Sequence, residues 1–305
     1  MVKLLPVNGD PWPAHPREMT QPTFLIIGAM KAGTTSLYHY LNLHPEIQMA
    51  SVKETNFFSG PPNGVPYPTG LKRIERLQDY EQLFDPAFAV RGEASPSYTV
   101  YPQRKGVPER IKDFVPQAKL IYLVRDPVAR AISQYDHHVA YENEQRSIED
   151  ALDPAEPHGR YTSPSFYAAQ LDRYLRHFPL DNILVVDQAD LLVSRQAALR
   201  EIFAFLSVDN SFYAQQFDQQ MNTGDELRQY SRSVVLVRYA RATPLQRLPR
   251  GLRVFMRQTV KRIASRPLAR TAVSDDFRER LQQLYADDVQ RLRELTGKAF
   301  STWSV

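Results

Sequence analysis

A strand, a glycine-bounded turn and a helix follow one another in FLIIGAMKAGTTSLYHYL, residues Phe24 to Leu41, and this junction most constrains the fold. A strand-to-helix junction of this kind aims backbone N–H groups and the positive end of a helix at one point, which is how proteins hold phosphate or sulfate. Gly28 and Gly33 permit the tight turn and the close approach of an anion. The sequence therefore predicts an anion site at the end of a buried strand.

The turn differs from an ATP-binding P-loop. Gly28 and Gly33 have the G-x-x-x-x-G spacing, but the residue after Gly33 is Thr34, where that loop requires Lys. The only lysine of the turn, Lys31, precedes Gly33, so its charge is displaced from the position beside a β- or γ-phosphate. A site for a nucleoside triphosphate with magnesium is therefore disfavoured.

Short apolar runs alternate with helical stretches through the first two thirds of the chain. The runs predict buried central strands over Phe24 to Ile27, Leu120 to Val124 and Ile183 to Val186. Apolar spacing predicts helices over Thr35 to Leu43, Gly70 to Phe84, Val128 to Tyr141, Ser165 to Phe178 and, closing the domain, Asp275 to Leu295. The alternation is typical of an α/β, P-loop-like, three-layer fold: a central, mostly parallel sheet with helices on both faces.

A second strand–helix junction, Leu120 to Tyr135, places polar side chains at the same edge of the predicted sheet. Arg125 directly follows the strand, at the carboxyl edge where ligands of α/β proteins bind. Ser133 lies about two turns into the following helix. Two separated motifs that agree are far more specific than either alone.

These motifs resemble the PAPS-dependent sulfotransferases, particularly the branch of heparan sulfate sulfotransferases and related bacterial enzymes; PAPS is 3'-phosphoadenosine 5'-phosphosulfate. The resemblance covers roughly Pro22 to Leu206 well and the C-terminal third weakly. It implies that Lys31 contacts the oxygen bridging sulfur and phosphorus, and that Arg125 and Ser133 hold the 3'-phosphate. It also implies a 5'-phosphate site made by Ala32, Gly33, Thr34, Thr35 and Ser36, with PAP (adenosine 3',5'-bisphosphate) as the product.

Transfer of a sulfuryl group also needs a base beside the acceptor. The segment Ser51 to Phe58 follows a short apolar stretch, and its family counterpart carries Lys-Glu before an aromatic pair. The resemblance implies that Glu54 is the general base and Lys53 a nearby cation. His44 is the rival base, but we expect it to be structural because His-Pro ends the preceding helix.

The same resemblance suggests further residues around the substrate. Family members line the cleft with a segment like Gly92 to Tyr98, which would place Glu93 or Tyr98 near the acceptor. Heparan-acting relatives often carry Lys at Glu93 or its neighbour, so we expect an acceptor other than a highly sulfated polyanion. His137 and His138 are expected on the substrate side; because they lack a further clustered ligand, no metal is expected. Arg228 is expected in a loop over the 3'-phosphate.

Composition bounds the domain organisation. For a chain of 305 residues, we expect an irregular leader over residues 1–21 and one sulfotransferase domain over residues 22–305. The chain contains no cysteine, which excludes disulfides, thiolate metal sites and a cysteine nucleophile. No segment reaches the roughly 18 apolar residues that span a bilayer, so a cytoplasmic location is expected.

The stretch from Pro244 to Arg270 concentrates the positive charge. It holds eight cations and no acid, whereas the whole chain carries only +4. Its apolar residues are spaced for one helical face, which predicts a basic amphipathic insertion or lid. It can be a solvated face, a guide for an acidic acceptor, or a peripheral contact with an anionic membrane.

The predicted function is transfer of a sulfuryl group from PAPS to a hydroxyl, less readily to an amine, of a carbohydrate, glycolipid or other small molecule. One alternative is a P-loop nucleotide kinase, because Ile183 to Asp187 resembles a magnesium-binding strand end. A second is a non-catalytic nucleotide- or nucleic-acid-binding module, suggested by the local basicity. Only Tyr239 and Phe255 lie near the basic stretch as aromatics, so no nucleic-acid partner is expected.

Overall fold

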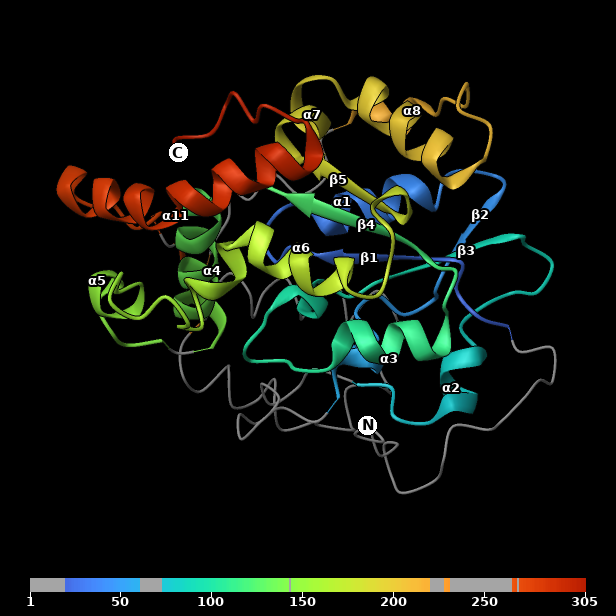
Figure 1. Cartoon of the computed structure of the whole chain (residues 1–305), viewed down its shortest axis with the longest axis horizontal. Helices are drawn as coiled ribbons and strands as arrows, with labels where there is room; N and C mark the ends of the chain where they lie inside the picture. The colour runs from blue at the N-terminus through green and yellow to red at the C-terminus, as the bar shows by residue number, and fades with distance from the viewer. Residues whose placement is uncertain (1–19, 61–72, 143, 220–227, 231–264, 268) are drawn as a thin grey trace.

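The computed structural model describes residues 20–60, 73–142, 144–219, 228–230, 265–267 and 269–305 (Figure 1). Its centre is a five-stranded, all-parallel sheet in the order β2-β3-β1-β4-β5. The strands are β1 (Phe24–Gly28), β2 (Ile47–Met49), β3 (Val90–Ala94), β4 (Lys119–Val124) and β5 (Ile183–Asp187). The three predicted central strands are confirmed to within one residue at either end.

The burial of their side chains explains why these strands could be predicted from the sequence. Every residue of β1 is buried, and so is every residue of β4 after its first. Strands of a parallel sheet covered on both faces read as continuous apolar runs. Strand β3, with the sequence VRGEA, breaks that rule because it buries a carboxyl, Glu93, in the sheet. This polar strand was not predicted.

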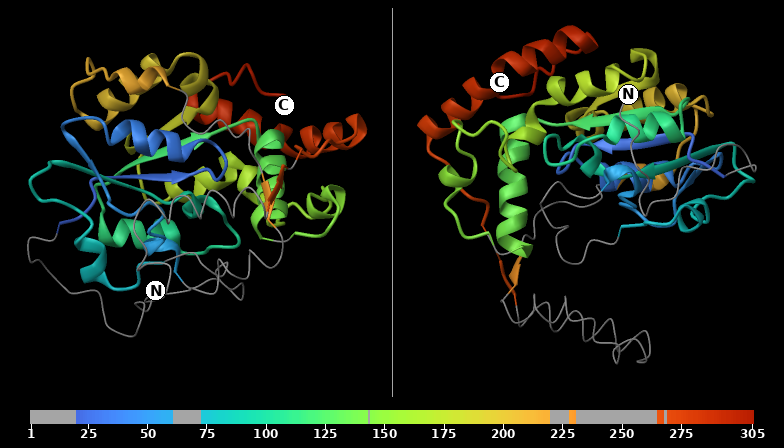
Figure 2. Two further views of the ribbon diagram at one scale, coloured as in Figure 1. Left: turned by 180° about the vertical axis from the view of Figure 1, so that it is seen from behind. Right: turned by 60° about the horizontal axis from the view of Figure 1, so that its bottom comes forward.

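Helices cover both faces of the sheet. Helix α1 lies on one face, and α3 and α6 lie on the other (Figures 1 and 2). The helices are α1 (Thr34–Leu41), α2 (Leu77–Glu81), α3 (Val107–Phe114), α4 (Pro127–Tyr141), α5 (Ile148–Ala151), α6 (Tyr167–Leu175), α7 (Gln188–Val193), α8 (Arg195–Leu206) and α11 (Asp275–Thr296). The predicted α/β class, with a parallel sheet between two helical layers, is confirmed.

The helix predicted over Gly70 to Phe84 is wrong for most of its described part. Residues 70–72 lie outside the described residues, and only Leu77–Glu81 is helical in the remainder. The backbone N–H of Ile74 donates to the carbonyl oxygen of Thr55 at 3.0 Å, so this part of the chain is bound to the segment after β2. Tertiary hydrogen bonding therefore overrides the apolar periodicity.

Helix α11 closes the domain as the sequence predicted. Its Asp288 carboxylate accepts the backbone N–H groups of Ala168 and Ala169, both at 2.9 Å, and so caps the first turn of α6. Burial raises the pKa of Asp288 to about 6. Helix α11 thereby fixes the N-terminal end of α6.

The description of the C-terminal third is partial. Strand β6 (Arg228–Tyr230) pairs antiparallel with β7 (Ser265–Pro267). Most of the predicted basic insertion, and residues 1–19 of the predicted leader, lie outside the described residues. Among the helices that are described, none combines the length and the apolar character needed to cross a membrane.

Candidate active site

The turn between β1 and α1 holds its backbone in unusual conformations. Lys31 has φ 69° and Gly33 has φ 97°, in the left-handed region that a lysine seldom adopts. Gly33 precedes the first turn of α1, and no side chain caps that turn. Within the described residues, the N–H groups of Gly33, Thr34 and Thr35 have no backbone acceptor. The turn therefore presents open donors and a helix N-terminus to an anion.

The two glycines of the turn have different roles. A Cβ at Gly28 would collide with the hydroxyl of Thr99 and the ring of Tyr122. Gly28 is thus required by packing, which corrects the expectation that it admits an anion. Gly33 is required by its positive φ, and a Cβ there would lie 3.2 Å from Nε2 of Gln188.

A cleft of about 1000 Å³ opens over the carboxyl ends of the strands. The segment after each of the five strands contributes to its wall, through Lys31, Glu54, Pro96, Arg125 and Gln188 in strand order. Strands β1 and β4 are neighbours, but the chain leads from β1 to β2 on one side of this pair and from β4 to β5 on the other side. Such a switch point is where α/β folds place a ligand crevice. Apart from Arg228, the predicted donor-binding residues and the predicted base therefore lie in one cleft.

Two cations lie side by side at the centre of this cleft. Nη1 of Arg125 donates to the carbonyl oxygen of Lys31 at 3.3 Å. Burial lowers the pKa of Lys31, and the like charge of Arg125 lowers it further, while Glu54 raises it. Burial also lowers the pKa of Arg125, and neighbouring Arg270 adds to that effect. Among the described residues, neither Lys31 nor Arg125 has a carboxylate at ion-pair distance, so the cleft is suited to an anionic ligand.

A third cation, Arg130, lies below the cleft and was missed by the sequence analysis. Its side chain is fully buried and donates to Oγ of Ser165 at 2.5 Å, to Oε1 of Gln134 at 2.6 Å and to the carbonyl oxygen of Tyr161. Its partners are neutral, so its charge is not cancelled and contributes to the lowered pKa of Lys31. The only sequence signal was its place one helical turn after Asp126, the N-cap of α4.

Glu54 stands at the edge of the cleft and is held there by its backbone. Its φ is 61°, its N–H donates to the carbonyl oxygen of Ala94 at 2.9 Å, and its own carbonyl accepts from Nδ2 of Asn56 at 2.9 Å. The carboxylate is 40% exposed and pairs with the ammonium group of Lys53. Glu54 thus combines a fixed main chain with a side chain that solvent and substrate can reach.

Glu93 and Tyr98 lie beneath this loop, and neither belongs to the cleft wall. Glu93 is fully buried and accepts a hydrogen bond from the hydroxyl of Thr55. Burial raises the pKa of Glu93 to about 7, against the opposing effect of hydrogen bonds from Thr55, Tyr98 and Tyr80. The hydroxyl of Tyr98 accepts the N–H of Phe58 at 3.2 Å. Their burial does not fit the predicted substrate contact; both support the loop that carries Glu54.

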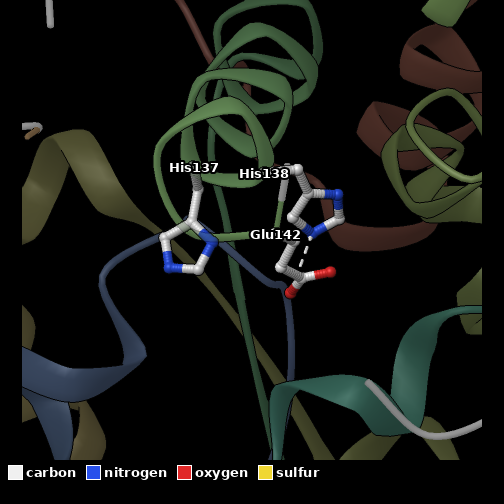
Figure 3. Close-up of side chains that lie close together, drawn as sticks. All are labelled: His137, His138 and Glu142. Atoms are coloured by element: carbon white, nitrogen blue, oxygen red, sulfur yellow. Dashed lines mark ion pairs between the residues drawn. The ribbon is translucent and has the colours of Figure 1, made fainter. Parts of the chain in front are cut away.

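The two predicted histidines differ in position. His137 lines the cleft, whereas His138 is 2% exposed, and burial lowers the pKa of His138 to about 3. No metal was expected from the sequence because this pair lacked a third clustered ligand. The fold supplies one in Glu142, and the possible ligand atoms of the three residues lie within 4.8 Å of one another (Figure 3).

The remaining predicted residues fall into three groups. Ser133 and residues Ala32 to Ser36 line the cleft. Lys53 does not line the cleft, but its ammonium group pairs with the carboxylate of Glu54, which does. Arg228 begins β6, but its side chain lies outside the described residues. Arg270, which the sequence analysis counted only as part of the basic stretch, lines the cleft beside Arg125.

Two rival assignments lose their support. Nε2 of His44 lies 2.9 Å from the carbonyl oxygen of Asp209 and Nδ1 accepts the N–H of Glu46 at 3.1 Å, so His44 is structural, as expected. Asp187, the magnesium ligand required by the kinase alternative, caps α7 through the N–H of Ala189 at 3.0 Å. It also accepts from Nε1 of Trp303 at 3.1 Å and does not line the cleft.

Comparison with known proteins identifies the family. The sequence model of the protein family described as "Sulfotransferase domain" matches residues 21–234. The chain therefore belongs to the sulfotransferase family. The chain is 30% identical over 214 residues to heparan sulfate glucosamine 3-O-sulfotransferase 5 of Mus musculus, covering 66% of this chain and 58% of that one. It is 28% identical over 208 residues to bifunctional heparan sulfate N-deacetylase/N-sulfotransferase 2 of Bos taurus, covering 61% and 22% respectively.

These matches span between about a fifth and three fifths of the curated relatives' own length. Among solved structures, a sulfotransferase from Alicyclobacillus acidocaldarius is similar, with a TM-score of 0.67 and 28% identity. That similarity covers 93% of this chain and 99% of the bacterial one. The similarity supports a sulfotransferase fold for the part of the chain that the structure describes.

Proposed function

We propose that this chain transfers a sulfuryl group from PAPS to a hydroxyl group of a carbohydrate, glycolipid or other small acceptor. The observation that carries the proposal is the convergence of Lys31, Arg125 and Glu54 in one cleft beside an anion-binding turn. Glu54 is close enough to Lys31 to raise its pKa. Family membership supports the reaction class, and the names of the heparan sulfate relatives support a carbohydrate acceptor.

The two ends of the nucleotide would take different parts of the cleft. The N–H groups and hydroxyls from Gly33 to Ser36 would bind the 5'-phosphate at the N-terminus of α1. Arg125 and Ser133 would hold the 3'-phosphate. Arg270 lies beside Arg125 and adds a second cation at this end, in the role that the sequence analysis gave to Arg228.

The transfer would proceed in line. The acceptor oxygen forms a bond to sulfur while the bond between sulfur and the bridging oxygen breaks, and the acceptor proton passes to the carboxylate of Glu54. The electron pair of the broken bond stays on the 5'-phosphate of PAP, where the ammonium group of Lys31 stabilises it. Burial lowers the pKa of Lys31, which makes it a stronger hydrogen-bond donor to that oxygen. Lys53 orients the carboxylate of Glu54.

Calorimetric titration tests the proposed donor. We expect PAP to bind at least about 10-fold more tightly than ATP with magnesium. The reason is that Arg125 and Arg270 can both bind a 3'-phosphate, and each charge-assisted hydrogen bond contributes about 1.5–3 kcal/mol. Tighter binding of ATP with magnesium would overturn the assignment. With PAP binding established, turnover of PAPS against a panel of sugars, glycolipids and phenols identifies the acceptor.

A further inference from the structure

The C-terminal end of α4 gathers three side chains that ligate metals. His137 and His138 belong to its last turns, and Glu142 is its C-cap. Nε2 of His138 lies 3.6 Å from Oε1 of Glu142, and Figure 3 shows a ring nitrogen of His137 directed toward the same carboxylate. Zinc–nitrogen and zinc–oxygen bonds of about 2.0–2.2 Å place neighbouring tetrahedral ligands roughly 3.3 Å apart. A shift of a few tenths of an ångström therefore suffices for His138 and Glu142.

Hydrogen bonding fixes which nitrogen of His138 carries its proton. The hydroxyl of Tyr161 donates its single proton to Oε2 of Glu144 at 2.7 Å, so it must accept from the Nδ1–H of His138 at 2.9 Å. Nε2 of the neutral ring then carries a lone pair that faces a carboxylate oxygen. Two acceptors in this position repel each other unless a cation lies between them. A hydrogen-bonded partner that fixes the tautomer is also typical of metal-binding histidines.

The carboxylate is held so that one oxygen remains available. Nη2 of Arg160 donates to Oε2 of Glu142 at 2.7 Å, which leaves Oε1 facing His138. His137 and Glu142 line the cleft, whereas His138 is buried behind them. An ion bound by all three would therefore keep a coordination position open to the cleft.

The chemistry of the ligands selects the kind of ion. Two of the three ligands are imidazole nitrogens, whereas calcium and magnesium prefer oxygen ligands. Arg160 pairs with Glu142, and Arg146 pairs with Glu144. Imidazole and carboxylate together suit zinc and its transition-metal neighbours.

We propose that His137, His138 and Glu142 bind one divalent transition-metal ion, best matched by Zn²⁺, with an open position that faces the cleft. Two histidines and one glutamate form the ligand set of zinc sites that keep a fourth position for water or substrate. The proposal is independent of the sulfuryl transfer inferred above, because its test measures metal binding alone.

The experiment is equilibrium dialysis of the full chain, first freed of metal with a chelator, against Zn²⁺ and separately against Co²⁺. We expect one ion per chain by elemental analysis, and for Co²⁺ the visible absorption of a tetrahedral site. His137→Ala and Glu142→Gln each remove one ligand, and we expect either change to weaken zinc binding by more than about 100-fold. Circular dichroism verifies that both variants are folded.

Two further variants separate this site from adventitious binding by surface histidines. Tyr161→Phe keeps all three ligands but removes the hydroxyl that accepts from His138, and we expect about 10- to 100-fold weaker binding. His39→Ala alters an exposed histidine on α1 and should leave binding unchanged. Failure of the unaltered chain to bind one zinc ion, or equal binding by the His137, Glu142 and Tyr161 variants, would overturn the proposal.

Discussion

The donor end and the acceptor end of the cleft are built in different ways. At the donor end, Lys31 to Ser36 and Arg125 with Ser133 each belong to a single strand–helix junction. At the acceptor end, Glu54 follows β2 but is held by Ala94 at the end of β3, and His137 comes from the far end of α4. Donor geometry therefore follows from local sequence, whereas acceptor geometry depends on contacts between distant segments.

The two ends also differ in how their charges are compensated. Within the described residues, Lys31 and Arg125 at the donor end have no carboxylate at ion-pair distance, so an anion is needed to offset their burial. At the acceptor end, Lys53 pairs with Glu54 and Arg160 pairs with Glu142. An acceptor end with paired charges suits a hydroxyl better than a polyanion, which agrees with the acceptor that we propose.

The largest effect is expected at the acceptor end, from Glu54→Gln. Glutamine keeps the size of the side chain but cannot take up the acceptor proton, so we expect turnover to fall by about 10³-fold. The affinity for PAP should be unchanged, because Glu54 lies outside the proposed nucleotide site. Glu149→Gln, at an exposed position on α5, is the matched control for turnover and calorimetry. Normal turnover in Glu54→Gln would remove this residue from the mechanism.

A smaller loss is expected at the donor end from Lys31→Met. Methionine nearly retains the length of the side chain. Like lysine, it carries a Cβ in the left-handed backbone conformation, so the backbone strain of the turn should be the same in the variant. Loss of the charge beside the leaving oxygen should lower kcat by about 10²-fold. The proposed mechanism requires kcat to fall by a larger factor than the affinity for PAP. If kcat and the affinity for PAP fell by equal factors, Lys31 would contribute only to binding of the ground state. Lys105→Met, at an exposed position, is the matched control.

Arg125→Met tests the other half of the donor end. We expect the affinity for PAP to fall by about 10- to 100-fold, because one charge-assisted contact with a phosphate is lost. The affinity for adenosine 5'-monophosphate, which lacks the 3'-phosphate, should change little. Titration calorimetry with both nucleotides measures the difference, and Arg200→Met on α8 serves as the exposed control. If both affinities fall equally, Arg125 does not read the 3'-phosphate.

The same contrast explains what could be predicted from the sequence. The continuous apolar runs of β1, β4 and β5 and the Lys31 to Ser36 motif are contiguous, so the sheet and the donor end could be inferred from them. Strand β3 could not, because two of the three hydroxyls that contact its buried Glu93, those of Thr55 and Tyr80, come from distant segments. Arg270 reaches the cleft only through the packing of the chain before α11, and no local pattern marks it. Glu142 follows His138 by four residues on α4, a helical spacing that could have been recognised in the sequence.

The fourth effect concerns stability rather than activity and again belongs to the acceptor end. The pKa of Glu93 is about 7 in the folded protein, against 4.5 as its ordinary value. The folded state therefore binds more protons than the unfolded state between these pH values. Stability from the neutral carboxyl is full below the ordinary value and is lost as pH rises through the folded one. The unfolding free energy should fall by about 2–3 kcal/mol between pH 5 and pH 8 through this group.

Glu93→Gln isolates this contribution, because glutamine has nearly the same shape and does not titrate. We expect urea unfolding of the variant to lack the decrease between pH 5 and pH 8 that the unaltered chain shows. His138, whose pKa is lowered to about 3, acts in the opposite direction, since its contribution is lost as pH falls. Because both proteins contain His138, its effect cancels in the comparison. Identical pH profiles would mean that Glu93 is ionised in the fold, and that the loop carrying Glu54 rests on a charged carboxylate.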